Sequence, residues 1–210
     1  MKISILGTGI VGQTISEKLI SMGHNVFMGT RDAEKTKFNT VPSQMSGRAF
    51  SDWYANNKSI SVVNYKNLPS ESDLFINATS GINSLEALRS VGKSKLSDKI
   101  IIDIANPLDF SNGLPATLSV CNTDSLAEQI QKEFPESKIV KSLNTMNCFL
   151  MMNPSMIAGN HNVFVSGNDS NAKSKVSELL NSIGWSDESI IDLGDITSAR
   201  ATEMLLPLWL

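Results

Sequence analysis

Short apolar runs alternate with amphipathic stretches along most of the chain. Runs rich in Ile, Val, Leu and Phe predict strands at 2–6, 26–28, 59–64, 73–78, 99–105, 137–142, 162–166 and 189–193. Apolar residues three or four positions apart predict helices at 10–22, 47–55, from 84 onward, and at 124–134, 174–183 and 196–210. Pro207 is expected to kink or end the last helix, and residues 110–115 are expected to form a loop. The alternation predicts an α/β fold, a doubly wound and mostly parallel sheet.

The first predicted strand leads directly into a glycine-rich turn. Gly7, Gly9 and Gly12 have the spacing G-x-G-x-x-G, and a helical pattern begins at Ile10. In a dinucleotide site the first glycine permits the turn, the second lets a diphosphate approach the backbone, and the third allows close helix–strand packing. The free N–H groups at the helix start also favour an anion. This strand–turn–helix order predicts a dinucleotide site, and the alternative is a turn that binds no ligand.

The end of the second strand indicates which dinucleotide is preferred. NAD-binding folds usually carry an acidic residue there for the ribose 2′-hydroxyl, whereas this chain has Thr30 and Arg31. The Arg31 guanidinium suits a 2′-phosphate, Thr30 supplies a hydroxyl, and Lys35 adds a second cation. Asp32 is interpreted as the N-cap of a short helix that begins at Ala33. The pattern favours NADP over NAD.

Composition limits the class of protein. The chain has 210 residues, with 41% hydrophobic and 19% charged residues, which suits one large globular domain or a domain with a small lobe. The formal net charge is −3 without a basic block, so a nucleic-acid partner is not expected. No apolar run is long enough to span a membrane. Cys121 and Cys148 have no metal-ligand spacing, so we expect free thiols, a cytoplasmic location and no metal site.

The residues just beyond the predicted strands are expected to form one surface. In a doubly wound sheet, ligands bind beyond the carboxyl ends of the strands. Each segment taken alone could be an ordinary turn, and their common edge favours a binding site. The segments are 7–12, 30–31, 78–81, 105–107 and 143–145.

Several stretches of the chain resemble one known family, the NADP oxidoreductase, coenzyme F420-dependent family. Its members are related to the N-terminal domain of pyrroline-5-carboxylate reductases and to the cytosolic domain of six-transmembrane metalloreductases. The resemblance implies an NADP-binding Rossmann domain over 1–142. It also implies a small C-terminal lobe over 143–210 that carries acceptor-site and dimer contacts. The matching stretches are Gly7-Thr-Gly-Ile-Val-Gly, Gly29-Thr-Arg-Asp-Ala-Glu-Lys, Ile101-Ile-Asp-Ile-Ala-Asn-Pro-Leu, Lys141-Ser-Leu-Asn-Thr-Met-Asn and Asp192-Leu-Gly-Asp-Ile-Thr-Ser-Ala-Arg-Ala-Thr-Glu.

The same resemblance implies where the cofactor contacts lie. The glycine turn would hold the diphosphate, Arg31 and its neighbours the 2′-phosphate, and the later strand ends the nicotinamide half. The expected cofactor-binding residues are Gly7, Thr8, Gly9, Ile10, Val11, Gly12, Thr30, Arg31, Lys35, Ala78, Thr79, Ser80, Asn106, Pro107, Asn144 and Thr145.

The chain lacks a recognisable set of catalytic side chains. Hydride transfer between a nicotinamide and a flavin-like ring does not require one, because the cofactor carries the chemistry. We therefore expect an NADPH-dependent oxidoreductase with a flavin-like or deazaflavin acceptor and no catalytic residue. One alternative is a non-catalytic NADP-binding sensor or partner protein. Another is an imine or carbonyl reductase, which would need a proton donor such as Lys141, Asn144 or Glu203.

The densest apolar cluster lies at the C-terminal end of the sequence. Between Met204 and Leu210 no polar stripe interrupts the apolar residues, although a helix that packs on its own domain normally has one. A second subunit is the simplest cover for this surface, so we expect a homodimer. In the alternative, Pro207 turns the last residues back into the protomer's own core.

Overall fold

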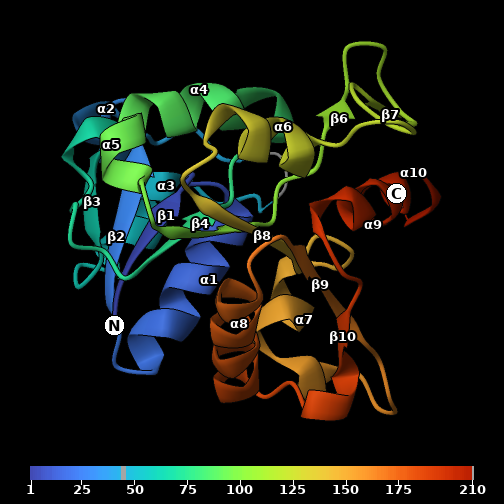
Figure 1. Cartoon of the computed structure of the whole chain (residues 1–210). Coiled ribbons are helices and arrows are strands. Elements are labelled where there is room, and N and C mark those ends of the chain that lie inside the picture. Colours follow the sequence, from blue (N-terminus) through green and yellow to red (C-terminus); the bar gives the residue numbers. More distant parts are fainter. Residues whose placement is uncertain (44–45, 210) are drawn as a thin grey trace.

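The computed structural model describes residues 1–43 and 46–209, and within them one sheet of eight strands forms the centre of the fold (Figure 1). The strand order is β10-β9-β8-β5-β4-β1-β2-β3. All neighbouring pairs are parallel except β8 and β9, which are antiparallel. A separate antiparallel pair, β6 and β7, forms a small hairpin. The strands are β1 (Lys2–Leu6), β2 (Asn25–Thr30), β3 (Ser61–Asn64), β4 (Leu74–Asn77), β5 (Ile100–Asp103), β6 (Leu108–Asp109), β7 (Thr117–Leu118), β8 (Lys138–Ser142), β9 (Val163–Gly167) and β10 (Ile190–Asp192).

Helices cover both faces of the sheet, with α4, α5 and α6 on one side and α1, α7 and α8 on the other (Figure 1). Each side has its own apolar core, and the central strands β4 and β5 are buried along their full length. The predicted α/β doubly wound, mostly parallel sheet is confirmed. The helices are α1 (Ile10–Ser21), α2 (Ala33–Lys37), α3 (Phe50–Ala55), α4 (Gly81–Val91), α5 (Lys93–Leu96), α6 (Leu126–Glu133), α7 (Cys148–Met152), α8 (Ser170–Ile183), α9 (Ala199–Met204) and α10 (Leu206–Trp209). Short 3₁₀ turns are η1 (Tyr65–Asn67), η2 (Pro154–Met156), η3 (Asp187–Ser189) and η4 (Ile196–Ser198).

Some predicted boundaries were wrong for identifiable reasons. Helix α8 begins at Ser170, before the expected start, because the Asp169 carboxylate accepts a hydrogen bond from the Ala172 N–H at 2.7 Å and caps the helix. The expected helix over 196–210 is divided into η4, α9 and α10. Pro207 lies just after the break between α9 and α10, as expected for a residue that lacks an N–H.

Two short helices and one hairpin were not predicted from the sequence pattern. Helices α5 and α7 have four and five residues, and the β6–β7 hairpin borders the expected loop. Each is shorter than the window over which hydrophobic periodicity can be recognised. Of the three, α7 has a local cap, because the Asn147 side chain accepts hydrogen bonds from the N–H groups of Phe149 and Leu150.

Strand register places the carboxyl ends of the central strands at one edge. Leu6 pairs with Gly29 on one side and with Asn77 on the other, so β2, β1 and β4 end together. The chain order reverses between β1 and β4, and in such sheets a ligand crevice opens at this switch point. The glycine turn after β1 lies at that position.

Residues after β8 extend the same sheet rather than forming a second one. Strand β9 pairs with β8, and β10 pairs with β9. The expected boundary at residue 142 coincides with the end of β8, and the division into a Rossmann domain and a lobe over 143–210 stays a prediction. In the described part of the chain, no helix has both the length and the apolar character needed to cross a membrane.

Candidate dinucleotide site

The three glycines of the turn occupy three different environments. Gly7 has a φ of +109°, a conformation that side chains other than glycine rarely adopt, and a Cβ there would lie 2.5 Å from the Ala78 carbonyl oxygen. A Cβ on Gly12 would lie 2.3 Å from the Gly7 carbonyl oxygen. At Gly9 a Cβ would meet nothing within 4 Å. The turn therefore needs glycine at positions 7 and 12 for packing, while position 9 faces open space.

The start of α1 presents its N–H groups beside this open space. Gly9 is the extended N-cap residue, and its carbonyl accepts the first helical hydrogen bond from the Gln13 N–H at 2.9 Å. The N–H groups of Ile10, Val11 and Gly12 therefore precede the helical ladder and are oriented along the positive end of the helix dipole. The Gln13 side chain fixes the turn by donating to the Thr8 carbonyl at 2.9 Å.

A groove at the switch point brings part of the predicted set together. Five further residues, from η1 and α4, line it and were not predicted. On α4, Asn83, Ala87 and Ser90 are spaced four and three residues apart, so the helical period could have indicated this face. Predicted residues that line the groove are Gly7, Thr8, Gly9, Arg31, Ala78, Thr79 and Ser80, and the additional ones are Tyr65, Asn83, Glu86, Ala87 and Ser90.

The residues after β2 differ in their exposure. Arg31 is exposed and lines the groove, close enough to Tyr65 to influence its titration. Burial raises the pKa of Tyr65, and the Arg31 charge opposes that rise. Asp32 caps α2 by accepting from the Lys35 N–H at 3.0 Å, which confirms its predicted role.

The other two residues expected at the 2′-phosphate lie outside the groove lining. Thr30 is buried, and its hydroxyl shares a hydrogen bond of 3.0 Å with the Thr36 hydroxyl. Lys35 is exposed on α2. Arg31 is therefore the cation of this group that faces the groove, and the binding roles of Thr30 and Lys35 stay predictions.

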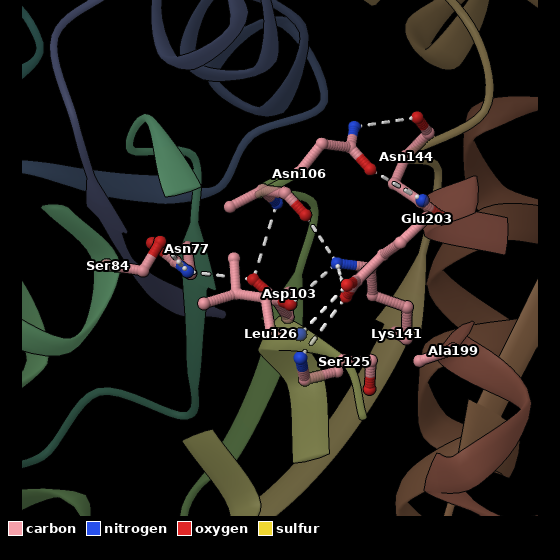
Figure 2. A network of polar contacts seen from close by, with 12 residues as sticks. Asn77, Ser84, Asp103, Asn106, Ser125, Leu126, Lys141, Asn144, Ala199 and Glu203 are labelled. Atoms are coloured by element: carbon pink, nitrogen blue, oxygen red, sulfur yellow. Dashed lines mark hydrogen bonds and ion pairs between the residues drawn. The ribbon is translucent and has the colours of Figure 1, made fainter. Parts of the chain in front are cut away.

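The residues after β5 and β8 form a separate cluster at the same sheet edge. The Asn106 amide donates to the Asn144 carbonyl at 3.0 Å, and the Asn144 amide donates to the Asn106 side-chain oxygen at 2.9 Å (Figure 2). Pro107 is buried, Thr145 is half-buried, and neither lines the groove. The two asparagines therefore lock the β5 and β8 ends together, and their contact with a nicotinamide stays a prediction.

A buried charged cluster lies beneath this edge (Figure 2). The Lys141 ammonium contacts the Asp103 and Glu203 carboxylates, each at 2.8 Å, and it also donates to the Ala105 carbonyl. All three side chains are at most 2% exposed. Burial would lower the pKa of Lys141, but the two carboxylates outweigh it and raise that pKa. Lys141 and Glu203, considered above as proton donors, are thus paired with each other inside the protein.

Glu203 also joins the C-terminal helix α9 to helix α6. Its carboxylate accepts from the N–H groups of Leu126 and Ala127 at 2.8 and 3.2 Å. Burial raises the pKa of Glu203, and the Lys141 charge opposes the rise. One turn earlier, Arg200 forms a two-pronged ion pair with Glu128. The sequence did not predict these contacts, since they join segments that are distant in the chain.

Among residues 1–43 and 46–209, no group of three or more His, Cys, Asp and Glu residues has the arrangement of a metal site. The groove instead offers backbone N–H groups, hydroxyls and one guanidinium. Those groups suit the diphosphate and sugar hydroxyls of a dinucleotide.

Comparisons with known proteins agree with this description. Residues 2–107 match the family described as NADP oxidoreductase, coenzyme F420-dependent. The solved structure of a protein from Arthrobacter sp. FB24, described as a proposed F420-dependent NADP reductase, is 50% identical. That match covers 100% of this chain and 91% of the Arthrobacter chain, with a TM-score of 0.93.

More distant proteins also match the chain, one in sequence and one in structure. Metalloreductase STEAP3 from Rattus norvegicus is 26% identical over 99% of this chain, which spans 38% of the length of that relative. An imine reductase from Myxococcus stipitatus in complex with NADP⁺ is 12% identical, with a TM-score of 0.65 over 100% of this chain and 61% of that chain. The resemblance found in the sequence is confirmed. The chain therefore belongs to the NADP oxidoreductase, coenzyme F420-dependent family, a family of NADP-dependent enzymes.

Proposed function

We propose that this protein binds NADP(H) in the groove and transfers hydride between it and a flavin-like acceptor, with a deazaflavin of the coenzyme F420 type as the favoured one. The observation that carries the proposal is the placement of Arg31 beside the open glycine turn. A permanent cation lies where an NAD site usually has a carboxylate, and it suits the 2′-phosphate that distinguishes NADP.

The described residues fit such a cofactor. The open space at Gly9 and the first N–H groups of α1 suit a diphosphate. Thr79 and Ser80 supply hydroxyls along the groove. When bound, the nicotinamide supplies the hydride, and the chain's part is to orient it and to exclude water.

A flavin-like acceptor is favoured because the candidate proton donors Lys141 and Glu203 are not available to a substrate. A carbonyl or imine acceptor needs a proton donor at the reacting atom, whereas Lys141 and Glu203 are buried and paired. Hydride transfer from NADPH to a deazaflavin is completed by the uptake of one proton at a ring nitrogen, and solvent can supply that proton. The description of the Arthrobacter protein as an F420-dependent NADP reductase supports the same acceptor.

An acceptor panel tests the proposal. The purified protein would be given NADPH with coenzyme F420, a free flavin, a quinone, a ferric chelate or a cyclic imine, and NADPH oxidation would be followed by absorbance. We expect the fastest steady oxidation with F420. Preference for the imine would identify an imine reductase. Binding of NADPH without turnover of any acceptor would identify a sensor or partner protein.

We also propose that the protein forms a homodimer through its C-terminal segment. Leu208 is 85% exposed and Leu205 is 42% exposed, whereas Leu206 between them is buried. Leu208 is therefore outside the protomer's own core, and a second subunit would cover it. Leu210, also named in the sequence prediction, lies outside the described residues.

A further inference from the structure

Three buried polar residues stand side by side across three parallel strands. In the strand register Asn77 of β4 pairs with Asp103 of β5, and Asp103 pairs with Lys141 of β8. All three are at most 1% exposed, and Figure 2 shows their side chains converging on one another. Buried polar groups are almost always hydrogen-bonded, so the partners of each of these side chains can be traced.

The charge of Lys141 fixes the direction of every bond in this row. Lys141 is an ammonium and can only donate, so the Asp103 oxygen 2.8 Å away accepts. The other oxygen of the Asp103 carboxylate lies 2.7 Å from the Asn77 side-chain nitrogen. It also accepts, because a carboxylate has no proton to donate. The Asn77 amide can therefore have only one orientation, with its nitrogen toward Asp103 and its oxygen toward the groove.

That orientation determines the role of the Thr79 hydroxyl at the groove. The second N–H of Asn77 donates to the Ser84 hydroxyl at 3.0 Å, and the Asn77 oxygen accepts from the Thr79 hydroxyl at 2.7 Å. Ser84 can in turn donate its proton to the Thr79 oxygen, 2.9 Å away, which is closer than the Ser80 carbonyl oxygen at 3.5 Å. The Thr79 hydroxyl therefore donates to Asn77 and accepts from Ser84. One lone pair of its oxygen is left for a further hydrogen bond.

We propose that Thr79 is a fixed hydrogen-bond acceptor for the dinucleotide and that Asn77 is its positioning residue. Thr79 is half-buried and lines the groove, so the remaining lone pair is available to a ligand. Its partner must be a donor, either a ribose hydroxyl or an amino group of a base or carboxamide. A phosphate oxygen at this position would be disfavoured, since it has no proton to donate. The inference rests on the proposed function and adds to it the polarity of this contact.

Calorimetric titration tests the Thr79 contact. NADP⁺ and 2′,5′-ADP, which lacks the nicotinamide mononucleotide half, would be titrated into the wild type, Thr79→Val and the matched control Thr79→Ser. The loss of one neutral hydrogen bond predicts binding of NADP⁺ about 3- to 10-fold weaker for Thr79→Val, and near wild-type binding for Thr79→Ser. A loss with both ligands places the donor in the adenosine half. A loss with NADP⁺ alone places it in the nicotinamide half.

Two different results would contradict the acceptor role of Thr79 and the proposed function, respectively. Equal affinities of wild type and Thr79→Val for NADP⁺ would overturn the acceptor role while leaving the proposed function intact. A wild-type protein that binds neither ligand would overturn the proposed function itself.

A double-mutant cycle tests the positioning role of Asn77. Asn77→Leu frees the Thr79 hydroxyl to rotate, so NADP⁺ affinity should fall with Thr79 present and should not fall further in the Thr79→Val background. Asp103→Asn keeps the shape of the side chain and serves where Asn77→Leu does not fold. Equal losses in both backgrounds would show that Asn77 acts on the fold as a whole rather than through Thr79.

Discussion

At the scale of single residues, two positions carry the dinucleotide hypothesis. Arg31 faces the groove at the end of β2, and Gly9 leaves the space beside α1 open. The first concerns which dinucleotide is preferred, and the second concerns whether any dinucleotide can enter. Each can therefore be tested separately.

Replacement of Arg31 should discriminate between the cofactors. Arg31→Ala should weaken NADPH binding by about 1.5–3 kcal/mol, because a charge-assisted contact to the 2′-phosphate is lost. NADH binding should hardly change. Titrations of both cofactors check this. Arg48→Ala is the matched control, because Arg48 is exposed and does not line the groove, and it should leave both affinities unchanged. Equal losses for NADPH and NADH would refute the 2′-phosphate role.

Replacement of Gly9 should block the groove without unfolding the protein. A side chain there meets no protein atom within 4 Å, so Gly9→Val should fold with a melting temperature close to that of the wild type. It should lose dinucleotide binding, because the side chain takes the place of the diphosphate. Calorimetry and thermal melting check both parts. Retained affinity would mean that the glycine run is only a turn.

At the scale of elements, the buried ion cluster joins the last helices to the sheet. Lys141 lies on β8, Asp103 on β5 and Glu203 on α9, and Glu203 also caps α6. A buried cluster of this kind is costly to break, because each remaining charge loses its partner.

Removal of the buried ammonium should destabilise the protein strongly. Lys141→Met leaves two unpaired buried carboxylates, so the free energy of unfolding should fall by about 3–5 kcal/mol. Lys138 of the same strand is the control: its side chain is 39% exposed and 3.9 Å from Asp169. Lys138→Met should cost less than about 1 kcal/mol. Denaturant unfolding measures both, and similar losses would contradict the importance of the buried cluster.

The raised pKa of Glu203 predicts a pH dependence of stability. Burial holds this pKa above its ordinary value of 4.5, so in the pH range just above 4.5 the folded protein binds the proton more tightly than the unfolded chain. Stability should therefore fall as pH rises through that range. Glu203→Gln should remove this part of the slope when unfolding is measured from pH 4 to pH 7. Identical slopes for the two proteins would contradict the assignment.

The sequence predicted the strands and the glycine turn around the groove well, because each depends on residues that are close together in the chain. Gly7, Gly9 and Gly12 have roles that follow from backbone sterics, and the apolar runs of β1, β4 and β5 are unmistakable. The groove lining on α4 was missed because it depends on which helix face turns toward the switch point. The link from Thr79 to Lys141 was missed because it depends on strand register across three strands, which no single stretch of sequence encodes.

At the scale of the whole molecule, the exposed C-terminal leucines are the basis of the proposed dimer. Light scattering at tens of micromolar should give the mass of a dimer for the wild type and a lower mass after deletion of 208–210. The physical reason is that Met204, Leu205 and Leu208 are all exposed in one short segment, and neighbouring exposed apolar side chains form the kind of patch that a partner covers. A monomeric wild type would contradict the dimer, whatever the truncation does.

The proposed reaction is hydride transfer between NADP(H) and a deazaflavin. The most direct measurement uses NADPH that carries deuterium at the transferable position of the nicotinamide, mixed with oxidised coenzyme F420 and the protein. Mass spectrometry of the products follows the label. We expect deuterium to appear on the reduced deazaflavin at a rate that depends on the protein and is lowered by Arg31→Ala. Binding of NADPH without any transfer of deuterium to the deazaflavin would contradict it.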